Sequence, residues 1–218
     1  MRKKELIKRY IIFLIGLFIV SLGISFITKA NLGTSPISSI PYVLSLGFDL
    51  TLGQFTILFS ILLIIFQIIL LGKKFKISSL LQIPASFLFG YFIDLTMMFL
   101  WWLNPSNYVA KIGSLLIGCC ILALGVYFEV LANVVMLPGE SFINAISIRF
   151  NTNFGNTKVC CDTSMAVIAI LISIVLFHSI EGVREGTVIS AAIGGFIVKF
   201  YGKIFGKLEK KVLMTETN

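Results

Sequence analysis

The sequence predicts an all-α membrane protein of six transmembrane helices. We expect them to form two inverted three-helix repeats, each with a short half-helix after its first span. Three observations predict this fold class. Apolar residues make up 57% of the 218 and charged residues only 13%, whereas soluble domains carry about 25% charged residues. Six apolar stretches are long enough to cross a bilayer, and a shift of 102 residues aligns part of the first half with the second.

Each apolar stretch approaches the roughly 20 residues that a helix needs to cross the hydrocarbon core. Leu, Ile and Phe dominate, without the alternating pattern of a transmembrane β-barrel. The stretches are residues 10–28, 52–71, 78–103, 112–131, 159–177 and 186–201. The predicted organisation is therefore a basic N-terminus (1–9), a first repeat (10–103), an external loop (104–111), a second repeat (112–202) and a tail (203–218).

Basic residues indicate the orientation. When six spans are threaded, 15 of the 18 Lys and Arg residues lie on one side, and only Lys29, Lys111 and Arg184 lie on the other. The positive-inside rule places the basic side, with both termini, in the cytoplasm. The first stretch is too long for the apolar core of a signal peptide, so we expect no cleavage. The net charge of +8 reflects topology and does not indicate nucleic-acid binding.

The internal repeat is carried by Gly, Pro, Asn and Ser rather than by interchangeable aliphatic residues. At an offset of 102 the pairs are Gly16/Gly118, Gly23/Gly125, Ala30/Ala132, Asn31/Asn133, Pro36/Pro138, Ser39/Ser141, Ser45/Ser147 and Gly53/Gly155. At an offset of 104 they are Ser86/Ser190, Gly90/Gly194, Phe92/Phe196 and Ile93/Ile197. Because each copy holds three spans, the second enters from the opposite face. We expect a pseudo-twofold axis in the membrane plane.

A segment too short to cross the bilayer follows the first span of each copy. Pro36 and Pro138 suit the first turn of a short helix, and apolar residues then recur at helical spacing. Two interpretations stay open. The segments are either interfacial helices that pack the bundle, or re-entrant arms whose N-termini point at a central site. Their polar residues favour the second, because interfacial helices carry Lys or Arg with aromatic anchors.

Four ionisable side chains lie in or beside the spans. Such groups are costly at membrane depth and usually face a polar interior. Asp94 and Glu129 have apolar counterparts in the repeat, so they break its symmetry. Asp162 and Lys29 lie close enough to an interface to be solvated. Glu129 and Asp94 are either site residues or structural partners of Lys29 or of amides.

Polar residues of the two short segments and acids of the spans define a candidate substrate site. Its members are Asn31, Ser35, Asp94, Glu129, Asn133 and Glu140. We predict that Asn31, Ser35, Asn133 and Glu129 line one polar cavity near the bilayer midplane. The corresponding function is a transporter, or a substrate-binding membrane subunit, for a small polar or anionic solute. Its acids are available for proton coupling, and a homodimer or an external ATPase would be a partner. The alternative is an accessory or assembly protein of the membrane.

Enzymatic chemistry has little support in the sequence. His178 is the only histidine, and the four cysteines form adjacent pairs, Cys119–Cys120 and Cys160–Cys161. Adjacent cysteines suit neither a zinc site nor a disulfide framework. No nucleotide-binding or hydrolase motif is present. We therefore expect no enzymatic activity, no cofactor and no metal.

Five motifs resemble those of the YczE/YyaS/YitT-type membrane proteins of bacteria. They are A-N-L-G-T-S-P at 30–36, T-L-G-Q at 51–54, F-G-Y-F-I-D at 89–94, A-N-x-x-x-x-P at 132–138 and E-G-T-V-I-S-A-A-I-G at 185–194. The resemblance covers roughly residues 10–202. It implies a small protein of the bacterial cytoplasmic membrane, and no established activity comes with it.

Overall fold

The computed structural model describes residues 3–213, and they form helices joined by loops. The elements are α1 (Lys3–Lys29), α2 (Pro36–Gly47), α3 (Leu52–Leu71), η1 (Gly72–Lys74), η2 (Ile77–Leu81), α4 (Gln82–Phe99), α5 (Tyr108–Ala132), α6 (Pro138–Phe150), α7 (Phe154–Phe177) and α8 (Glu185–Leu213). The predicted N-terminal segment and tail extend beyond the described residues at 1–2 and 214–218.

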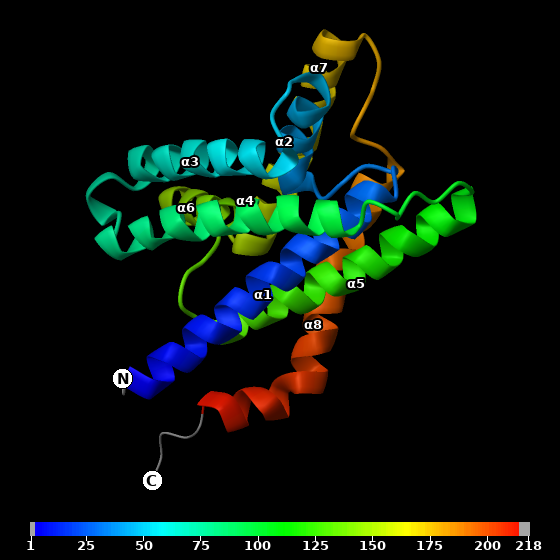
Figure 1. Ribbon diagram of the computed structural model, residues 1–218. Helices are drawn as coiled ribbons and strands as arrows, with labels where there is room; N and C mark the ends of the chain where they lie inside the picture. The colour runs from blue at the N-terminus through cyan, green and yellow to red at the C-terminus, as the bar shows by residue number, and fades with distance from the viewer. Residues whose placement is uncertain (1–2, 214–218) are drawn as a thin grey trace.

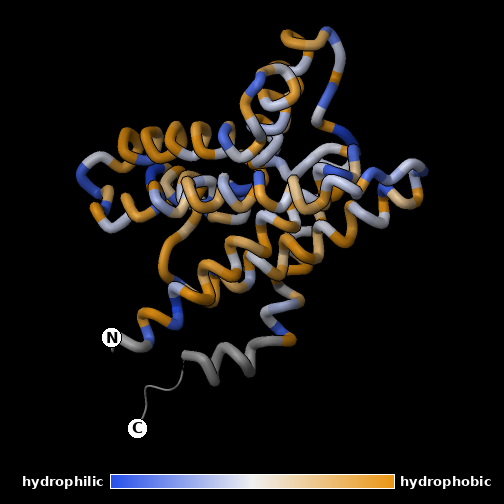
Figure 2. The backbone as a smooth tube through the Cα atoms, viewed as in Figure 1, coloured by the Kyte–Doolittle hydropathy of each residue, from blue (hydrophilic) through white to orange (hydrophobic). Residues whose placement is uncertain are grey.

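Six of the described helical segments are long and apolar enough to cross a membrane: α1, α3 with η1, η2 with α4, α5, α7 and α8. Many of their large apolar side chains face outward, such as Ile69 (71% exposed) and Val175 (75% exposed). Figure 2 shows hydrophobic residues along most of the length of these helices. An outward apolar surface suits lipid contact, so the prediction of a six-span all-α membrane protein is confirmed.

The two short helices, α2 and α6, are the predicted half-helices. They contain 12 and 13 residues and each begins with a proline, Pro36 or Pro138. Proline is tolerated there because the first N–H of a helix has no intrahelical partner. Their first turns meet, since a Cβ added at Gly139 would lie 2.9 Å from the Ile37 side chain.

The centre of the fold is the antiparallel pair α1 and α5, which lie side by side in Figure 1. Glycines allow the two backbones to approach. A Cβ added at Gly125 would lie 2.5 Å from the Val20 backbone nitrogen, and one at Gly16 would lie 3.0 Å from the Glu129 nitrogen. The predicted role of these glycines, close helix contact, is therefore observed at this crossing.

The remaining helices pack in matching ways. α4 packs on α1 as α8 packs on α5, and α2 packs on α7 as α6 packs on α3. Two contacts are not matched to the same extent, the smaller being that of α2 with α8, and the larger involves α3 and α4. α3 packs along α4, whereas α7 and α8 do not pack along each other over their described residues. Figure 1 shows α3 beside α4, while α8 passes behind α5, on which it packs.

Glycines mark this difference at atomic scale. In the first copy Gly53 of α3 touches Gly90 of α4, and a Cβ at Gly90 would lie 2.6 Å from the Gly53 carbonyl oxygen. Their counterparts in the repeat are Gly155 of α7 and Gly194 of α8. A Cβ at Gly194 would meet none of the described atoms within 4 Å. The same helix pair is therefore closed in one copy and open in the other.

Candidate functional site

Asn31 and Asn133 end the first helix of each copy. Both adopt left-handed backbone, with φ of 54° and 48° respectively. Asparagine tolerates this conformation better than residues with larger side chains, and it is common just beyond a helix C-terminus. In the second copy the Asn133 N–H donates to the Glu129 carbonyl oxygen at 3.2 Å. Helix termination therefore explains the repeated asparagine without a ligand.

A cavity of about 160 Å³ lies where α5 ends and α6 begins. Three of the predicted site residues line it: Glu129, Asn133 and Glu140. The rest of its wall is the apolar set Val130, Val134, Val135, Met136 and Leu137. Among the described residues, its lining includes two carboxyl groups and no Lys or Arg. An anionic solute would be repelled here, so the anionic alternative does not fit this cavity.

Glu129 is the most buried acid of this cavity, with 7% exposure. Its Oε1 atom is buried and has no hydrogen-bond partner among the described residues. The predicted alternative, a structural pair with Lys29, is wrong. Glu129 lies beside Gly16 of α1, thirteen positions before Lys29, and the helical rise separates those positions by about 20 Å.

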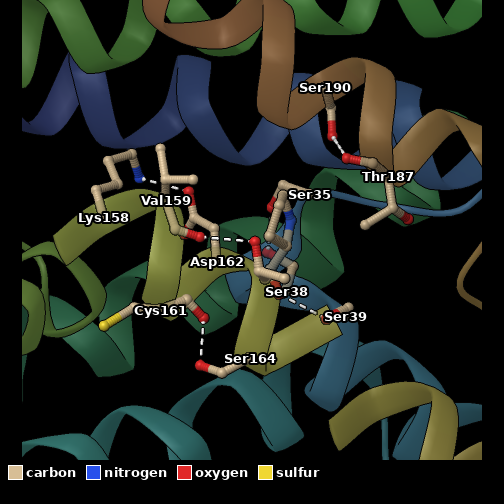
Figure 3. Close-up of polar contacts among 12 residues, drawn as sticks. Ser35, Ser38, Ser39, Lys158, Val159, Cys161, Asp162, Ser164, Thr187 and Ser190 are labelled. Carbon is tan, nitrogen blue, oxygen red and sulfur yellow. Dashed lines mark hydrogen bonds and ion pairs between the residues drawn. The ribbon is translucent and has the colours of Figure 1, made fainter. Parts of the chain in front are cut away.

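Glu140 lies in the first turn of α6, which is not one of the six spanning helices, and it is half-buried. Burial raises the pKa of its carboxyl group, the Lys158 ammonium lowers that pKa, and the Asp162 carboxylate raises it. Lys158 is itself paired with Asp162 at 3.3 Å, one turn apart on α7. Figure 3 shows this pair on α7, drawn together with serines of the neighbouring α2.

The expectation that Asp162 is solvated is wrong. Its side chain is 13% exposed, and its Oδ1 atom is buried without a hydrogen-bond partner among the described residues. The signal in the sequence was the spacing of Lys158 and Asp162, since residues four apart meet on one face of a helix.

Asn31 lines a different cavity, of about 460 Å³, at the other end of the α1–α5 pair. Lys29, Tyr42, Ser45, Thr51 and Asn104 contribute to its polar wall. Ser35 is not among the described residues that line either cavity, and its hydroxyl donates to the Ser38 hydroxyl oxygen at 3.0 Å. The prediction of a single cavity lined by Asn31, Ser35, Asn133 and Glu129 therefore differs from the structure.

Asp94 holds the start of α3 against α4. Its carboxylate accepts a hydrogen bond from the Thr51 hydroxyl at 2.7 Å and another from the Gly53 N–H at 2.9 Å. Thr51 also forms a capping box with Gln54. We call this group of four residues the Asp94 clasp. These bonds satisfy the carboxylate, so its place among the candidate site residues has a structural explanation.

Two glutamines hold the start of α6. The Gln67 side-chain amide donates to the Pro138 carbonyl oxygen at 3.2 Å, and the Gln82 amide donates to the Ser141 hydroxyl at 3.2 Å. The two side chains also bond to each other at 3.3 Å. Buried amides that bond across helices fix the position of α6, and with it the position of Glu140.

Comparison with known proteins identifies the family. A model described as a family of unknown function (DUF6198) matches residues 7–203. The chain belongs to this family. It is similar to the uncharacterized protein YyaS of Bacillus subtilis (strain 168), with 26% identity over 200 residues that cover 88% of this chain and 92% of the relative. It is also similar to the uncharacterized membrane protein YczE of the same organism, with 27% identity over 202 residues that cover 91% of this chain and 87% of the relative. No solved structure matches the chain.

These matches confirm the resemblance to YczE- and YyaS-type proteins, and the motifs that carried it meet in space. The motifs at 51–54 and 89–94 form the Asp94 clasp. The motif at 30–36 binds the one at 185–194: the Gly186 N–H donates to the Leu32 carbonyl oxygen at 2.8 Å, and the Thr34 N–H donates to the Thr187 hydroxyl oxygen at 3.2 Å. In this family member both contacts join segments distant in sequence, so they act as structural ties.

Proposed function

We propose that this protein is a small membrane carrier, or a substrate-binding membrane subunit, for a small polar solute. Its site is the cavity between α5 and α6 that contains Glu129 and Glu140. The single observation that carries the proposal is the unmatched helix contact, with α3 packed on α4 and α7 standing apart from α8. Two copies of one module in different states are what a carrier needs in order to open to one face at a time.

The proposal includes an inverted repeat. It is supported by the matching helix contacts: α1 with α4 matches α5 with α8, α2 with α7 matches α6 with α3, and α2 with α3 matches α6 with α7. It is also supported by the antiparallel crossing of α1 and α5, where Gly16 and Gly125 of opposite copies approach each other. Equivalent first helices that cross antiparallel are expected from a twofold axis in the membrane plane.

The proposal also treats α2 and α6 as re-entrant arms. Their first turns touch at Ile37 and Gly139, although the helices belong to different copies. Two interfacial helices on opposite faces of a bilayer would be separated by its hydrocarbon core of about 30 Å. Contact between their N-termini therefore favours arms that meet inside the protein.

We propose that both termini lie in the bacterial cytoplasm, because the positive-inside rule favours the side that carries most of the basic residues. In that orientation the open pair, α7 and α8, and the Glu129 cavity lie toward the cytoplasmic side. The structure would then represent an inward-open state, and exchange would close α7 on α8 while α3 leaves α4. A homodimer or an external ATPase stays a prediction from the sequence.

Distances between spin labels test the exchange. Positions 164 and 191 lie on exposed surfaces of α7 and α8, and their repeat counterparts 62 and 87 lie on exposed surfaces of α3 and α4. One variant would carry cysteines in place of both Ser164 and Ala191, and a second variant would carry them in place of both Leu62 and Phe87. Both variants would lack the four native cysteines. After spin labelling, pulsed electron paramagnetic resonance in lipid nanodiscs would measure the distance between the two labels of each variant.

A carrier should show two populations at both pairs, with the shorter distance at one pair coinciding with the longer distance at the other. A single fixed distance at each pair, unchanged by lipid, pH or added solutes, would contradict the carrier. That result would favour the alternative, an accessory membrane protein in which the repeat is only a scaffold.

A further inference from the structure

A buried acid without a partner is the most unusual group in the structure. Among the described residues, Glu129 Oε1 is buried and accepts no hydrogen bond, although the side chain lines the cavity between α5 and α6. A carboxylate can only accept hydrogen bonds, so a group that satisfies it must donate an N–H or O–H or carry positive charge. Burying it without such a group costs free energy.

The electrostatics of the cavity select the sign of its ligand. Glu140 lines it together with Glu129. The C-terminus of α5 carries partial negative charge and the N-terminus of α6 partial positive charge, so the two helix ends offset each other and the two carboxyl groups set the sign. The nearest basic side chain of α7, Lys158, is already paired with Asp162. Arg9 of α1 donates to the Ala132 carbonyl oxygen at 3.4 Å and does not line the cavity.

The walls and the volume select the kind of cation. Five apolar side chains line the cavity beside the two acids, so a bare inorganic ion would keep only part of its hydration there. No group of three or more His, Cys, Asp and Glu among the described residues could hold a metal ion. A volume of about 160 Å³ corresponds to about five water molecules, which accommodates an ammonium group with a few carbon atoms.

We propose that the cavity between α5 and α6 binds a small primary organic ammonium ion, with Glu129 and Glu140 accepting its N–H groups and the apolar wall contacting its alkyl body. This inference rests on the proposed function and names its substrate class. Binding itself does not require α7 to close on α8, so it can be measured separately from the exchange between states.

The test uses purified full-length protein in lipid nanodiscs. Thermal unfolding would be followed with chloride salts of propylammonium, tetramethylammonium and potassium, and with sodium propionate, all at one ionic strength. Propylammonium should raise the unfolding temperature by about 3–6 °C at ten times its Kd. Tetramethylammonium has no N–H to donate and should bind at least tenfold more weakly, while potassium and propionate should have no effect.

Two variants and one control locate the site. Glu129→Gln and Glu140→Gln should each weaken propylammonium binding at least tenfold, because each removes one negative acceptor. Glu181→Gln is the matched control, since Glu181 lies in the exposed loop before α8 and does not line the cavity. Binding should also weaken as the pH falls, because protonation removes the charge of both acids, while propylammonium keeps its own charge as Lys does.

Saturation-transfer difference NMR on the wild-type protein measures propylammonium binding directly. It therefore tests the proposal even where Glu129→Gln fails to fold. Stabilisation by propionate or equal stabilisation by potassium would overturn the proposal. Propylammonium binding that survives both substitutions would also overturn it. So would the absence of propylammonium binding together with an unchanged unfolding temperature of Glu129→Gln. If propylammonium binds while the spin-label distances stay fixed, the cation site stands and the carrier fails.

Discussion

Replacing Gly125 by alanine places a methyl group at the crossing of α1 and α5. The added Cβ would lie 2.5 Å from the Val20 backbone nitrogen and 2.9 Å from the Gly16 carbonyl oxygen. Both obstacles are backbone atoms, so a change of side-chain rotamer cannot relieve the contact. The two helices must separate by roughly 1 Å, because ordinary contacts between such atoms begin near 3.5 Å.

The expected magnitude follows from two opposed effects. Overpacking of a close contact costs about 1–3 kcal/mol, and the rigid obstacle favours the upper end. Alanine gains about 1 kcal/mol over glycine in a helix. The net destabilisation should be about 2 kcal/mol, which lowers the unfolding temperature by roughly 4–8 °C for a chain of this length.

Gly113→Ala is the matched control on the same helix. A Cβ at Gly113 would meet none of the described atoms within 4 Å, so only the helix-propensity gain of about 1 kcal/mol applies and stability should rise. Thermal unfolding of both variants in the same nanodiscs would measure the difference. Equal unfolding temperatures for Gly125→Ala and Gly113→Ala would refute the close α1–α5 crossing.

Three further predictions concern topology, the Asp94 clasp and the helix end. In a background without native cysteines, a cysteine at Ser106 should react with an impermeant reagent in intact cells and one at Asn153 should not; the reverse pattern would contradict the orientation. Asp94→Asn should lower the unfolding free energy by about 1–2 kcal/mol, because a charged acceptor of two hydrogen bonds is lost; unchanged stability would show that the clasp contributes little. Asn133→Val should cost about 1–2 kcal/mol through its left-handed backbone while Asn133→Gly is tolerated, and equal stabilities in thermal unfolding would refute this.

Much of the fold could be predicted because its signals are local. Composition and the length of the apolar stretches predict the six spans, and a proline followed by helical spacing predicts α2 and α6. The first helix is longer than its apolar stretch, since α1 begins at Lys3 rather than near residue 10. The basic residues before the stretch continue the helix, and hydropathy alone does not detect a charged helical turn.

The candidate site was harder to predict because it depends on contacts between distant segments. Asp94 is 43 residues from Thr51, and no local pattern reveals that its carboxylate accepts the Thr51 hydroxyl. Lys29 and Glu129 were paired in prediction because both lie near helix ends. The antiparallel packing of α1 and α5 separates those ends. The sequence predicts the asparagines as ligands, whereas backbone geometry at the helix ends explains them.

The positions that repeat and those that do not therefore have different physical origins. Repeated Gly, Pro and Asn satisfy backbone requirements common to both copies: close crossing, helix start and helix end. Glu129 occupies the repeat position of Ile27, and Ile27 is fully buried in the first copy. There the start of α8 covers residues 32–34. Residues 134–137 of the second copy are at least partly exposed. An acid is tolerated where its copy is open, and an apolar residue occupies the same position where the copy is closed.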